Sequence, residues 1–349
     1  MMRVLNVDMS FNWKWRMDAD YPQKNGLKAF SCFACGGGST MGYKLAGFDV
    51  IGHNDIDPRM IELYKANHHP RISITCDIRA MIEANDLPQE LFELDVLDGS
   101  PPCSTFSMAG AREDGWGKEK VFREGQAMQT LDDLFFEFIA LAKKLQPKVV
   151  ISENVKGMLF GNAQKYVKRI FDEFDKAGYE TQLFCLNGST MGVPQARERV
   201  FFLSRRKDLN LPKIALSFTE KAIRFGDVKA GVGREITAKS ILEAKPFIRY
   251  GEKNLSHAKK RSVNKDECFG VLLAWDQFTP MTITSAGKFI RMPEFVEFSE
   301  EDFRNVGSFP QDYDFGKETA QYVVGMSVPP LMIANVSSEV AKQWLLPIK

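Results

Sequence analysis

The stretch LKAFSCFACGGGSTMGYKLAGFDVIGHNDIDP, residues 27–58, decides the fold class. It consists of an apolar run that ends in glycines, a helix-like segment, and a second apolar run that ends in acids. That order predicts a strand, a tight turn, a helix and a strand, which together make a βαβ unit. Strand and helix patterns alternate to about residue 205, so we expect an α/β fold with a doubly wound, mostly parallel sheet.

The rest of the chain extends this pattern. Apolar runs predict further strands at residues 72–78, 94–102, 147–155, 180–187 and 199–206, with the last two close enough for a hairpin. Helical spacing predicts helices over 131–145 and 166–178, the second closed by Gly178. From residue 206 to about 316 no helix pattern stands out. Near the C-terminus a final amphipathic helix is predicted by Leu331, Ile333, Val336 and Val340.

Size and composition are those of an ordinary globular protein. The 349 residues suffice for one large domain and a smaller one. No apolar run approaches the roughly 20 residues that span a bilayer, and no signal-peptide pattern is present, so we expect a cytoplasmic protein. Cys32 and Cys35 form a single C-x-x-C. A redox pair or a zinc site is disfavoured, because neither a second pair nor suitably spaced histidines accompany it, and we expect no metal.

Charge is distributed unevenly along the chain. The net charge is +1, yet the segment from Arg205 to Lys265 holds 16 Lys and Arg against 6 Asp and Glu. Such a segment suits binding to a polyanion. A solvated, lysine-rich face is the alternative that composition leaves open.

The glycines of FACGGGSTMG, residues 33–42, fall at the carboxyl end of the first predicted strand, where a parallel sheet binds ligands. Glycine lets the backbone approach a ligand closely, and the start of the next helix favours negative charge. Gly36, Gly38 and Gly42 give G-x-G-x-x-x-G and not the dinucleotide pattern G-x-G-x-x-G. An adenosine-bearing cofactor without a pyrophosphate is therefore preferred over a nicotinamide cofactor.

Acids close the next two predicted strands. Asp55 and Asp57 lie where a carboxylate can bind ribose hydroxyls, and Asp77 lies where one can accept from an adenine amino group. Each also has a structural interpretation, because Asp57 followed by Pro58 suits a helix N-cap and Asp77 suits a turn. For each residue on its own, both interpretations stay open.

The sequence DGSPPCSTFS, residues 98–107, places Cys103 directly behind two prolines, which fix φ and remove two N–H groups. Residues 104–126 are rich in glycine and charge and predict a long mobile loop, typical of lids and binding loops. A fixed thiol under a moving loop suits covalent catalysis. A buried structural cysteine is the alternative.

Further polar residues are expected at the same edge of the sheet. Glu153 directly follows the apolar strand residues KVVIS (148–152), so we expect it at the carboxyl edge of the sheet, where it could act as an acid. Arg197 and Arg199 are alternate residues entering a strand, so they share a face and can hold a phosphate, a carboxylate or a carbonyl oxygen. A pair of surface arginines is the alternative.

Together these motifs resemble the DNA (cytosine-5)-methyltransferases of the bacterial or phage modification type. The resemblance spans about residues 28–342 and rests on FSCFACGGGSTMGYKLAGFDV, NDIDP, CDIR, DGSPPCSTFS, ENVKG, GVPQARERVFFL, FPQDY and GMSVPP, which occur in the family's order. It implies a Rossmann-like fold that uses S-adenosylmethionine.

The resemblance also implies a mechanism. Cys103 would add to carbon 6 of a cytosine flipped out of duplex DNA, and carbon 5 would take the methyl group of S-adenosylmethionine. Glu153 would contact ring N3 and the exocyclic amine, Arg199 would hold the base carbonyl, and Arg197 would support the site. The two prolines would hold the nucleophile still while the loop closes over the base.

Several cofactor contacts follow from the resemblance. Phe33 would pack on the cofactor, Asp55 would bind the ribose, Asp77 would contact the adenine and Ser327 would add a further contact. The expected cofactor-binding set is Phe33, Ala34, Cys35, Gly36, Gly37, Asp55, Ile56, Asp77, Ile78, Pro102 and Ser327.

Four positions depart from the family pattern. Cys35 stands where many members have glycine, and Ser104 stands where glutamine is usual. Ile56 stands where an aromatic residue is frequent, and Met326 replaces a common asparagine. None of these removes a catalytic group, so we expect an active enzyme in which these departures affect the cofactor affinity and not the chemistry.

The basic segment occupies the place of the family's target-recognition domain. We expect a catalytic and cofactor-binding domain over 1–205, a target-recognition domain over 206–316, and a C-terminal segment over 317–349 that returns to the catalytic domain. Expected partners are duplex DNA, held by Lys and Arg at its phosphates, and a cognate restriction endonuclease. We expect a monomer that binds no membrane.

Three alternatives are weighed against this prediction. An RNA (tRNA) cytosine-5 methyltransferase would use the same scaffold. A non-catalytic DNA-binding module is disfavoured because Cys103, Glu153, Arg197 and Arg199 are all present. A nicotinamide oxidoreductase is disfavoured by the glycine spacing.

Overall fold

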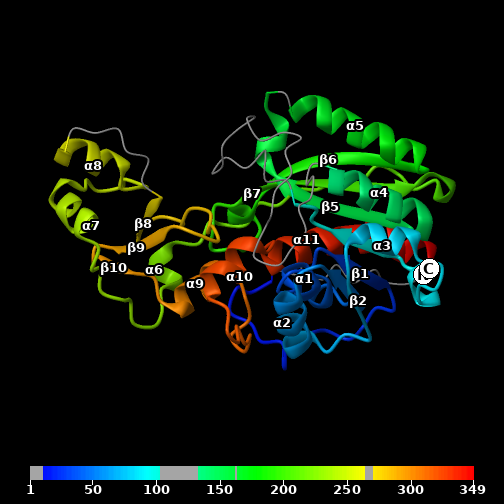
Figure 1. Cartoon of the computed structure of the whole chain (residues 1–349), viewed down its shortest axis with the longest axis horizontal. Coiled ribbons are helices and arrows are strands. Elements are labelled where there is room, and N and C mark those ends of the chain that lie inside the picture. Colours follow the sequence, from blue (N-terminus) through cyan, green and yellow to red (C-terminus); the bar gives the residue numbers. More distant parts are fainter. Residues whose placement is uncertain (1–10, 103–132, 162, 264–269) are drawn as a thin grey trace.

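A seven-stranded sheet forms the centre of the larger lobe in the computed structural model, which describes residues 11–102, 133–161, 163–263 and 270–349 (Figure 1). Its strands are β1 (Lys28–Cys32), β2 (Asp49–Asp55), β3 (Ile72–Thr75), β4 (Val96–Gly99), β5 (Val149–Val155), β6 (Tyr179–Asn187) and β7 (Glu198–Arg206). The order is β3-β2-β1-β4-β5-β7-β6, with β7 antiparallel to both of its neighbours. The predicted α/β class and the predicted β6–β7 hairpin are confirmed.

The direction of winding reverses between β1 and β4. From β1 the chain continues outward through β2 and β3, and it then returns to β4 on the other side of β1. Cys32 pairs with Gly99, so the turn after β1 and the segment after β4 leave the sheet at the same edge. Ligands of doubly wound sheets bind at the carboxyl ends of the strands beside such a reversal.

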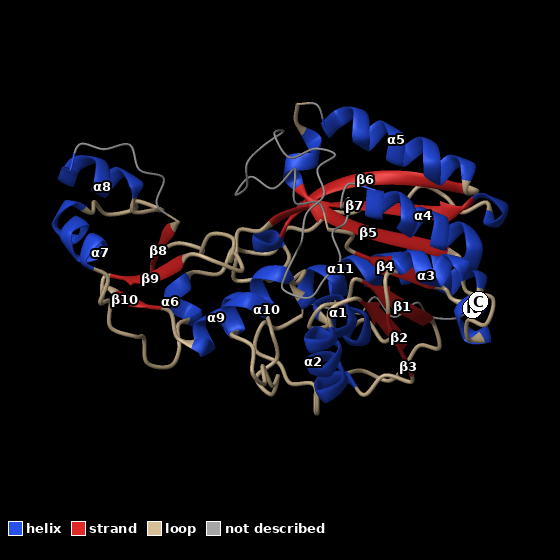
Figure 2. Ribbon diagram, viewed as in Figure 1, coloured by secondary structure: helices blue, strands red, loops and turns tan. Residues whose placement is uncertain are grey.

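Helices cover both faces of this sheet (Figure 2). One face carries α1 (Gly38–Leu45), α2 (Pro58–His68) and α11 (Pro330–Val340), and the other carries α3 (Ile78–Glu83), α4 (Leu134–Leu145) and α5 (Ala163–Lys176). Side chains alternate between the faces: Val96 and Ile151 pack in the first core, Leu97 and Val150 in the second. Neighbouring residues of one strand therefore point to opposite faces of the sheet, each covered by its own set of helices.

Local sequence explains where several helices begin and end. The side chain of Asp57 accepts from the Arg59 N–H at 3.0 Å, and Pro58 is the first residue of α2, so the N-cap interpretation of Asp57 is confirmed. Gly178, shortly after α5, has a φ of 95°, as a helix-ending glycine should. The predicted start of α4 at residue 131 lies outside the described residues.

The last long helix is buried on nearly all sides. The four residues predicted to share one face of α11 are buried, but so are Met332, Asn335 and Ser337. The prediction of an amphipathic helix is therefore wrong, because the side of α11 that was expected to face solvent is also buried. By length and composition alone the segment Ala320–Ile348 could span a membrane, contrary to the sequence expectation, but 78% of its most apolar window is buried inside the fold, like a core helix.

The smaller lobe contains a three-stranded sheet of order β10-β9-β8 (Figure 1). The remaining elements are α6 (Phe225–Val228), α7 (Lys239–Ala244), α8 (Ser256–Val263), β8 (Val271–Trp275), β9 (Lys288–Met292), β10 (Val296–Glu297), α9 (Glu300–Val306) and α10 (Ala320–Met326). A separate core lies within residues 236–295, whereas Phe225 and Phe303 belong to the core of the larger lobe. The domain boundaries at 206 and 316 stay a prediction.

The segment before β1 packs against residues near the C-terminus. Trp15 is buried, and its Nε1 donates to the Ser308 carbonyl at 2.9 Å. The carboxylate of Asp312 accepts from the N–H groups of Met17 and Asp18. The residues of FPQDY are thus held from outside by the N-terminal segment.

Candidate active site

The turn between β1 and α1, residues 33–37, is called the cofactor turn here. Phe33, Cys35 and Gly37 all have positive φ, at 55°, 46° and 85°. Asp55 holds the turn, because its Oδ2 accepts from the Cys35 N–H at 2.8 Å while its Oδ1 accepts from the Asp57 N–H at 3.0 Å. A Cβ on Gly37 would overlap the His68 ring, so this position requires glycine for space as well as for φ.

The carbonyl of Gly36 is fixed by two side chains that come from distant parts of the chain. Tyr313 donates its hydroxyl to this carbonyl at 2.7 Å, and His68 Nε2 lies 3.1 Å away. Burial lowers the pKa of His68 to about 3, so the ring is neutral and its Nε2 carries the proton that the carbonyl accepts. The turn is therefore held in one geometry by α2 and by the FPQDY segment.

The other predicted cofactor residues lie around this turn with different degrees of exposure. Ala34 and Ile78 are buried, whereas Phe33, Ile56 and Pro102 are partly exposed. Phe33 packs against Phe138 of α4, with 6.3 Å between ring centroids. These residues stay predicted contacts.

Asp77 has a structural role in the fold. Its side chain accepts from the Arg79 N–H at 2.9 Å, so it caps α3, and it also pairs with the Arg79 guanidinium at 3.1 Å. The turn interpretation is thus supported by geometry. Contact with an adenine stays a prediction. The adenine amino group would have to donate to a lone pair of this carboxylate that Arg79 does not use.

Ser327 closes the far side of the site. Its hydroxyl is buried and finds no hydrogen-bond partner among the described residues, which is costly unless a ligand supplies one. A Cβ on Gly38 would overlap the carbonyl of Val328 and crowd Ser327, so the GMSVPP segment lies directly against the start of α1. The structure thus offers an orphaned hydroxyl beside the helix N-terminus that follows the cofactor turn.

The segment after β4 is tied to β5 by an asparagine. Asn154, the middle residue of ENV, is buried, and its Nδ2 donates to the Pro101 carbonyl at 3.0 Å. This bond fixes the backbone two residues before position 103. Cys103 itself and the predicted loop at 104–126 lie outside the described residues.

A buried ion pair stands next to this bond. Arg199 Nε lies 2.8 Å from Glu153 Oε1, with side chains 14% and 8% exposed. Burial lowers the pKa of Arg199, while the charge of Glu153 opposes that shift. Because an unpartnered buried charge is costly, each side chain keeps the other in place.

Arg197 points elsewhere. Its Nη1 donates to the Ile283 carbonyl at 2.8 Å, and its Nη2 donates to the carbonyls of Gly325 and Ser327 at 3.1 and 3.0 Å. Since it is buried and engaged with the backbone, Arg197 positions the GMSVPP segment. This geometry agrees with the supporting role that the resemblance implies for Arg197.

Sequence reasoning missed three residues of the site. Asn154 and Tyr313 lie inside quoted motifs, so membership of ENV and FPQDY was an available signal. His68 lies in no motif and was not foreseeable. Among the described residues, no group of three or more His, Cys, Asp or Glu side chains is arranged to hold a metal ion.

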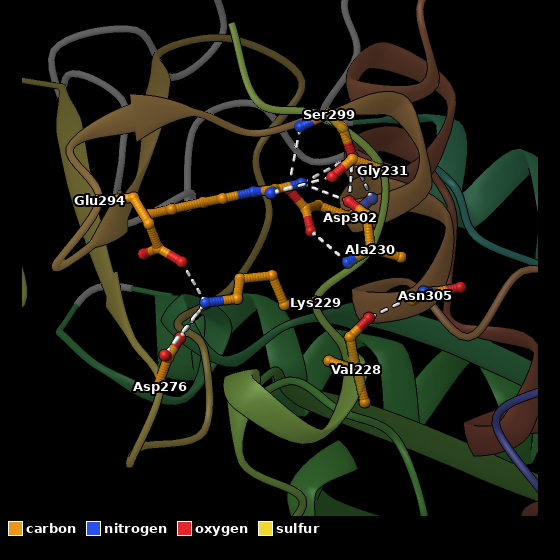
Figure 3. Close-up of polar contacts among 10 residues, drawn as sticks. Val228, Lys229, Ala230, Gly231, Asp276, Glu294, Ser299, Asp302 and Asn305 are labelled. Carbon is orange, nitrogen blue, oxygen red and sulfur yellow. Dashed lines mark hydrogen bonds and ion pairs between the residues drawn. The ribbon is translucent and has the colours of Figure 1, made fainter.

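The two lobes meet at a charged joint, drawn in Figure 3. Arg291 of β9 is buried and pairs with the fully buried Asp302 of α9 at 2.5 Å. Arg291 also donates to the carbonyls of Ala230 and Gly231, and Ser299 Oγ donates to Ala230. One guanidinium group thus joins the start of α9 to residues 230–231, which lie about 60 positions before Arg291 in the chain.

A second cation strengthens the same joint. Lys229 donates to Asp276 at 2.9 Å and also pairs with Glu294, and these side chains lie together in Figure 3. Asn305 Nδ2 donates to the Val228 carbonyl at 2.8 Å. Residues 228–231, at and after the end of α6, are therefore held by side chains from three other segments.

Comparison with known families decides which proteins this chain belongs with. The family model of C-5 cytosine-specific DNA methylases matches residues 27–342. The chain belongs to this family. Within it, the chain is 38% identical to the Type II methyltransferase M.FnuDI of Fusobacterium nucleatum over 188 residues, covering 53% of the chain and 48% of that protein.

Of two further methylases, one extends the likeness over most of the chain. The match to M.NgoPII of Neisseria gonorrhoeae, at 35% identity, covers 54% of the chain and 50% of that protein. The chain thus spans about half the length of M.FnuDI and M.NgoPII. M1.HphI of Haemophilus parahaemolyticus is 28% identical over 333 residues, covering 90% of the chain and 87% of that methylase.

Solved structures share the methylase fold at low sequence identity. A prophage-encoded protein of E. coli, described as a DNA modification methyltransferase, aligns with a TM-score of 0.68 at 17% identity, over 91% of this chain and 99% of that chain. The DNMT2 of Spodoptera frugiperda aligns with a TM-score of 0.65 at 16% identity, over 90% and 99% of the two chains. These likenesses concern the fold.

Proposed function

We propose that this protein transfers a methyl group from S-adenosylmethionine to carbon 5 of a cytosine flipped out of a specific duplex DNA sequence, through a covalent adduct with Cys103. The observation that carries the proposal is the buried Glu153–Arg199 pair at the carboxyl edge of β5. It lies beside the Asn154–Pro101 bond that fixes the backbone entering Cys103. Membership of the methylase family supports the same chemistry.

The cofactor site fits an adenosine-bearing sulfonium compound. Ser327 offers a buried hydroxyl without a partner in the described part of the chain, and Gly36 and Gly37 of the cofactor turn leave no room for a Cβ. Asp55, Ile56, Asp77 and Ile78 would bind the adenosine, with Phe33 packed against it. When bound, S-adenosylmethionine supplies an electrophilic methyl group.

The base site is assigned to the ion pair. Glu153 would hold ring N3 and the exocyclic amine, which stabilises charge that develops on the ring. The contacts of Arg199 within the described residues use Nε and Nη1, so Nη2 is the group we assign to the base carbonyl. The Cys103 thiolate would add to carbon 6, and after methylation a base would remove the carbon 5 proton as the thiolate leaves. A cytosine that is stacked inside the duplex cannot reach Cys103, Glu153 or Arg199, so the cytosine must be flipped out of the helix.

Target recognition is assigned to the smaller lobe. Part of its positive charge is neutralised inside the fold, because Arg224 pairs with Asp227 and Arg261 pairs with Glu252. We assign phosphate contacts to lysines and arginines outside such pairs. Action as a monomer in the cytoplasm, alongside a cognate restriction endonuclease, belongs to the same proposal.

The test is a covalent trap. Long duplex DNA with 5-fluorocytosine in place of cytosine is incubated with the protein and S-adenosylmethionine, because fluorine at carbon 5 blocks release of the adduct. A complex that survives denaturing electrophoresis is expected for the wild type and for Cys185→Ala, whose exposed cysteine serves as the matched control. Cys103→Ala should bind DNA without forming it. Absence of the adduct in the wild type, or its persistence in Cys103→Ala, would contradict the proposal.

A further inference from the structure

A fully buried carboxyl group that the mechanism above does not use lies beneath the cofactor turn. Asp98 of β4 is 1% exposed. Ser31 of β1 donates to its Oδ2 at 2.7 Å, Tyr43 of α1 donates to its Oδ1 at 3.2 Å, and Ser39 in the first turn of α1 is a third hydrogen-bond partner. One carboxyl group therefore joins the two strands at the reversal to the helix that starts at the cofactor turn.

The surroundings of Asp98 keep both of its protonation states accessible near neutral pH. Burial raises its pKa to about 7, against the opposing effect of the hydroxyl donors, and the charge of Glu153 raises it further. The titratable groups that interact with it electrostatically are Cys32 of β1, Tyr43 of α1, Tyr64 of α2 and Glu153 of β5. In such a poorly solvated place, one negative charge acts on its neighbours more strongly than it would in water.

The two ligands expected at the cofactor turn differ by one charge. The sulfonium sulfur of S-adenosylmethionine is positive, whereas the thioether sulfur left after methyl transfer is neutral. We propose that Asp98 is a specificity-determining residue, whose ionised form anchors α1 beneath the cofactor turn and favours the sulfonium donor over the thioether product. The inference rests on the proposed function, because it takes these two compounds as the ligands of the turn.

Thermodynamic linkage turns this proposal into a measurable effect. If ionised Asp98 favours the cation, then binding of the cation must favour ionisation of Asp98 by the same factor. S-Adenosylmethionine should therefore release protons on binding below neutral pH, and S-adenosylhomocysteine should release fewer. If the pKa of Asp98 differs by one unit between the complexes with the two ligands, the ratio of their dissociation constants changes about tenfold between protonated and ionised Asp98. That ratio should favour the donor more strongly as the pH rises from 6 to 8.

The experiment is calorimetric titration of the full chain at pH 6.5 with each ligand separately, in buffers that differ in ionisation enthalpy. This pH keeps the ligands' α-amino groups, which titrate near pH 8, protonated. The wild type should release more protons with S-adenosylmethionine than with S-adenosylhomocysteine. Asp98→Asn, which keeps the shape and removes the charge, should bind both ligands without that difference.

Two further variants keep the test decisive. Asp95→Asn changes a carboxylate at the other end of β4, which pairs with Lys148, and should leave the difference intact. Tyr43→Phe removes one donor from the Asp98 carboxylate, so the proton release should move to higher pH, which tests the idea even if Asp98→Asn does not fold. Equal proton release by the two ligands in the wild type would overturn the inference. Failure of the wild type to bind S-adenosylmethionine at all would instead count against the proposed function.

Discussion

The cofactor turn and the joint between the lobes are both held by side chains from other segments, but the turn uses neutral groups and the joint uses charged ones. Each holds together segments that are far apart in the sequence. The Gly36 carbonyl of the turn is held by neutral, buried groups, Tyr313 and His68, whereas the joint is held by the charged pair of Arg291 and Asp302. Neutral donors fix geometry without imposing a net charge on a ligand. A charged joint is strong only while both partners are present.

The largest expected effect comes from removing one charge at the joint. Arg291→Met leaves Asp302 buried without its partner, which should cost about 3–5 kcal/mol of unfolding free energy. Denaturant unfolding measures that cost, and fluorescence anisotropy should show weaker binding to duplex DNA. Binding of S-adenosylhomocysteine should change much less, since the cofactor turn is held by Tyr313, His68 and Asp55.

The matched control for the joint is Arg224→Met. Arg224 and Asp227 form an ion pair whose side chains are 62% and 47% exposed, so its loss should cost much less stability than the loss of Arg291. If the two variants lose similar stability, the joint is not held by its buried charge.

The next largest effect concerns space at the cofactor turn. Gly37→Ala places a Cβ against the His68 ring at a φ of 85°, so strain and overpacking together should cost about 2–4 kcal/mol. We expect at least a tenfold loss of S-adenosylhomocysteine affinity by calorimetry. Gly178→Ala is the matched control, because Gly178 has a φ of 95° but nothing lies within 4 Å of the added Cβ. Equal losses in the two variants would show that φ alone matters.

The contrast also explains what the sequence could reveal. The cofactor turn, Asp55 and the edge of the sheet at Glu153 were predictable, because strand ends, glycines and acids are local patterns. The ion pair of Glu153 with Arg199 depends on the register of β5 with β7, in which Val155 lies opposite Arg199. These two strands are not neighbours in the chain, because β6 lies between them in the sequence, so a local pattern did not predict this pairing. The binding partners of Arg197 were not predictable, because its guanidinium reaches carbonyls at Ile283, Gly325 and Ser327.

The smaller lobe was the least predictable part of the fold. Its helices are short: α7 has 6 residues and α6 has 4, which is too few for a periodic pattern to stand out. Its stability depends on contacts such as Arg291 with Asp302, which a local pattern does not encode. Conversely, Asp77 lies at the edge of the sheet where a ligand was predicted, but in the fold its side chain caps helix α3.

A smaller effect is expected from acid. His68 is neutral in the fold with a pKa of about 3, against an ordinary value of 6.5. As the pH falls below about 6.5, the unfolded chain takes up a proton that the folded ring does not, so stability is lost progressively towards pH 3. Between pH 8 and pH 5 this corresponds to about 2 kcal/mol for one such residue.

Urea unfolding at several pH values tests this expectation. His68→Gln keeps an N–H for the Gly36 carbonyl and should reduce the acid sensitivity, whereas His257→Gln, at an exposed position of α8, should leave it unchanged. An acid profile that is the same in all three proteins would remove His68 as the cause. His53, whose pKa burial lowers to about 3, should retain part of the sensitivity in either variant.

The smallest expected effect removes one neutral donor from the cofactor turn. Tyr313→Phe deletes the hydroxyl that donates to Gly36 and should cost about 1 kcal/mol, with roughly a fivefold loss of S-adenosylhomocysteine affinity. Tyr179→Phe deletes a hydroxyl that donates to the Pro147 carbonyl at 2.9 Å and should cost similar stability without changing that affinity. Because both variants lose one buried hydrogen bond to a carbonyl, only the difference in affinity reports on the turn. Equal affinities in the two variants would mean that His68 and Asp55 hold the turn without Tyr313.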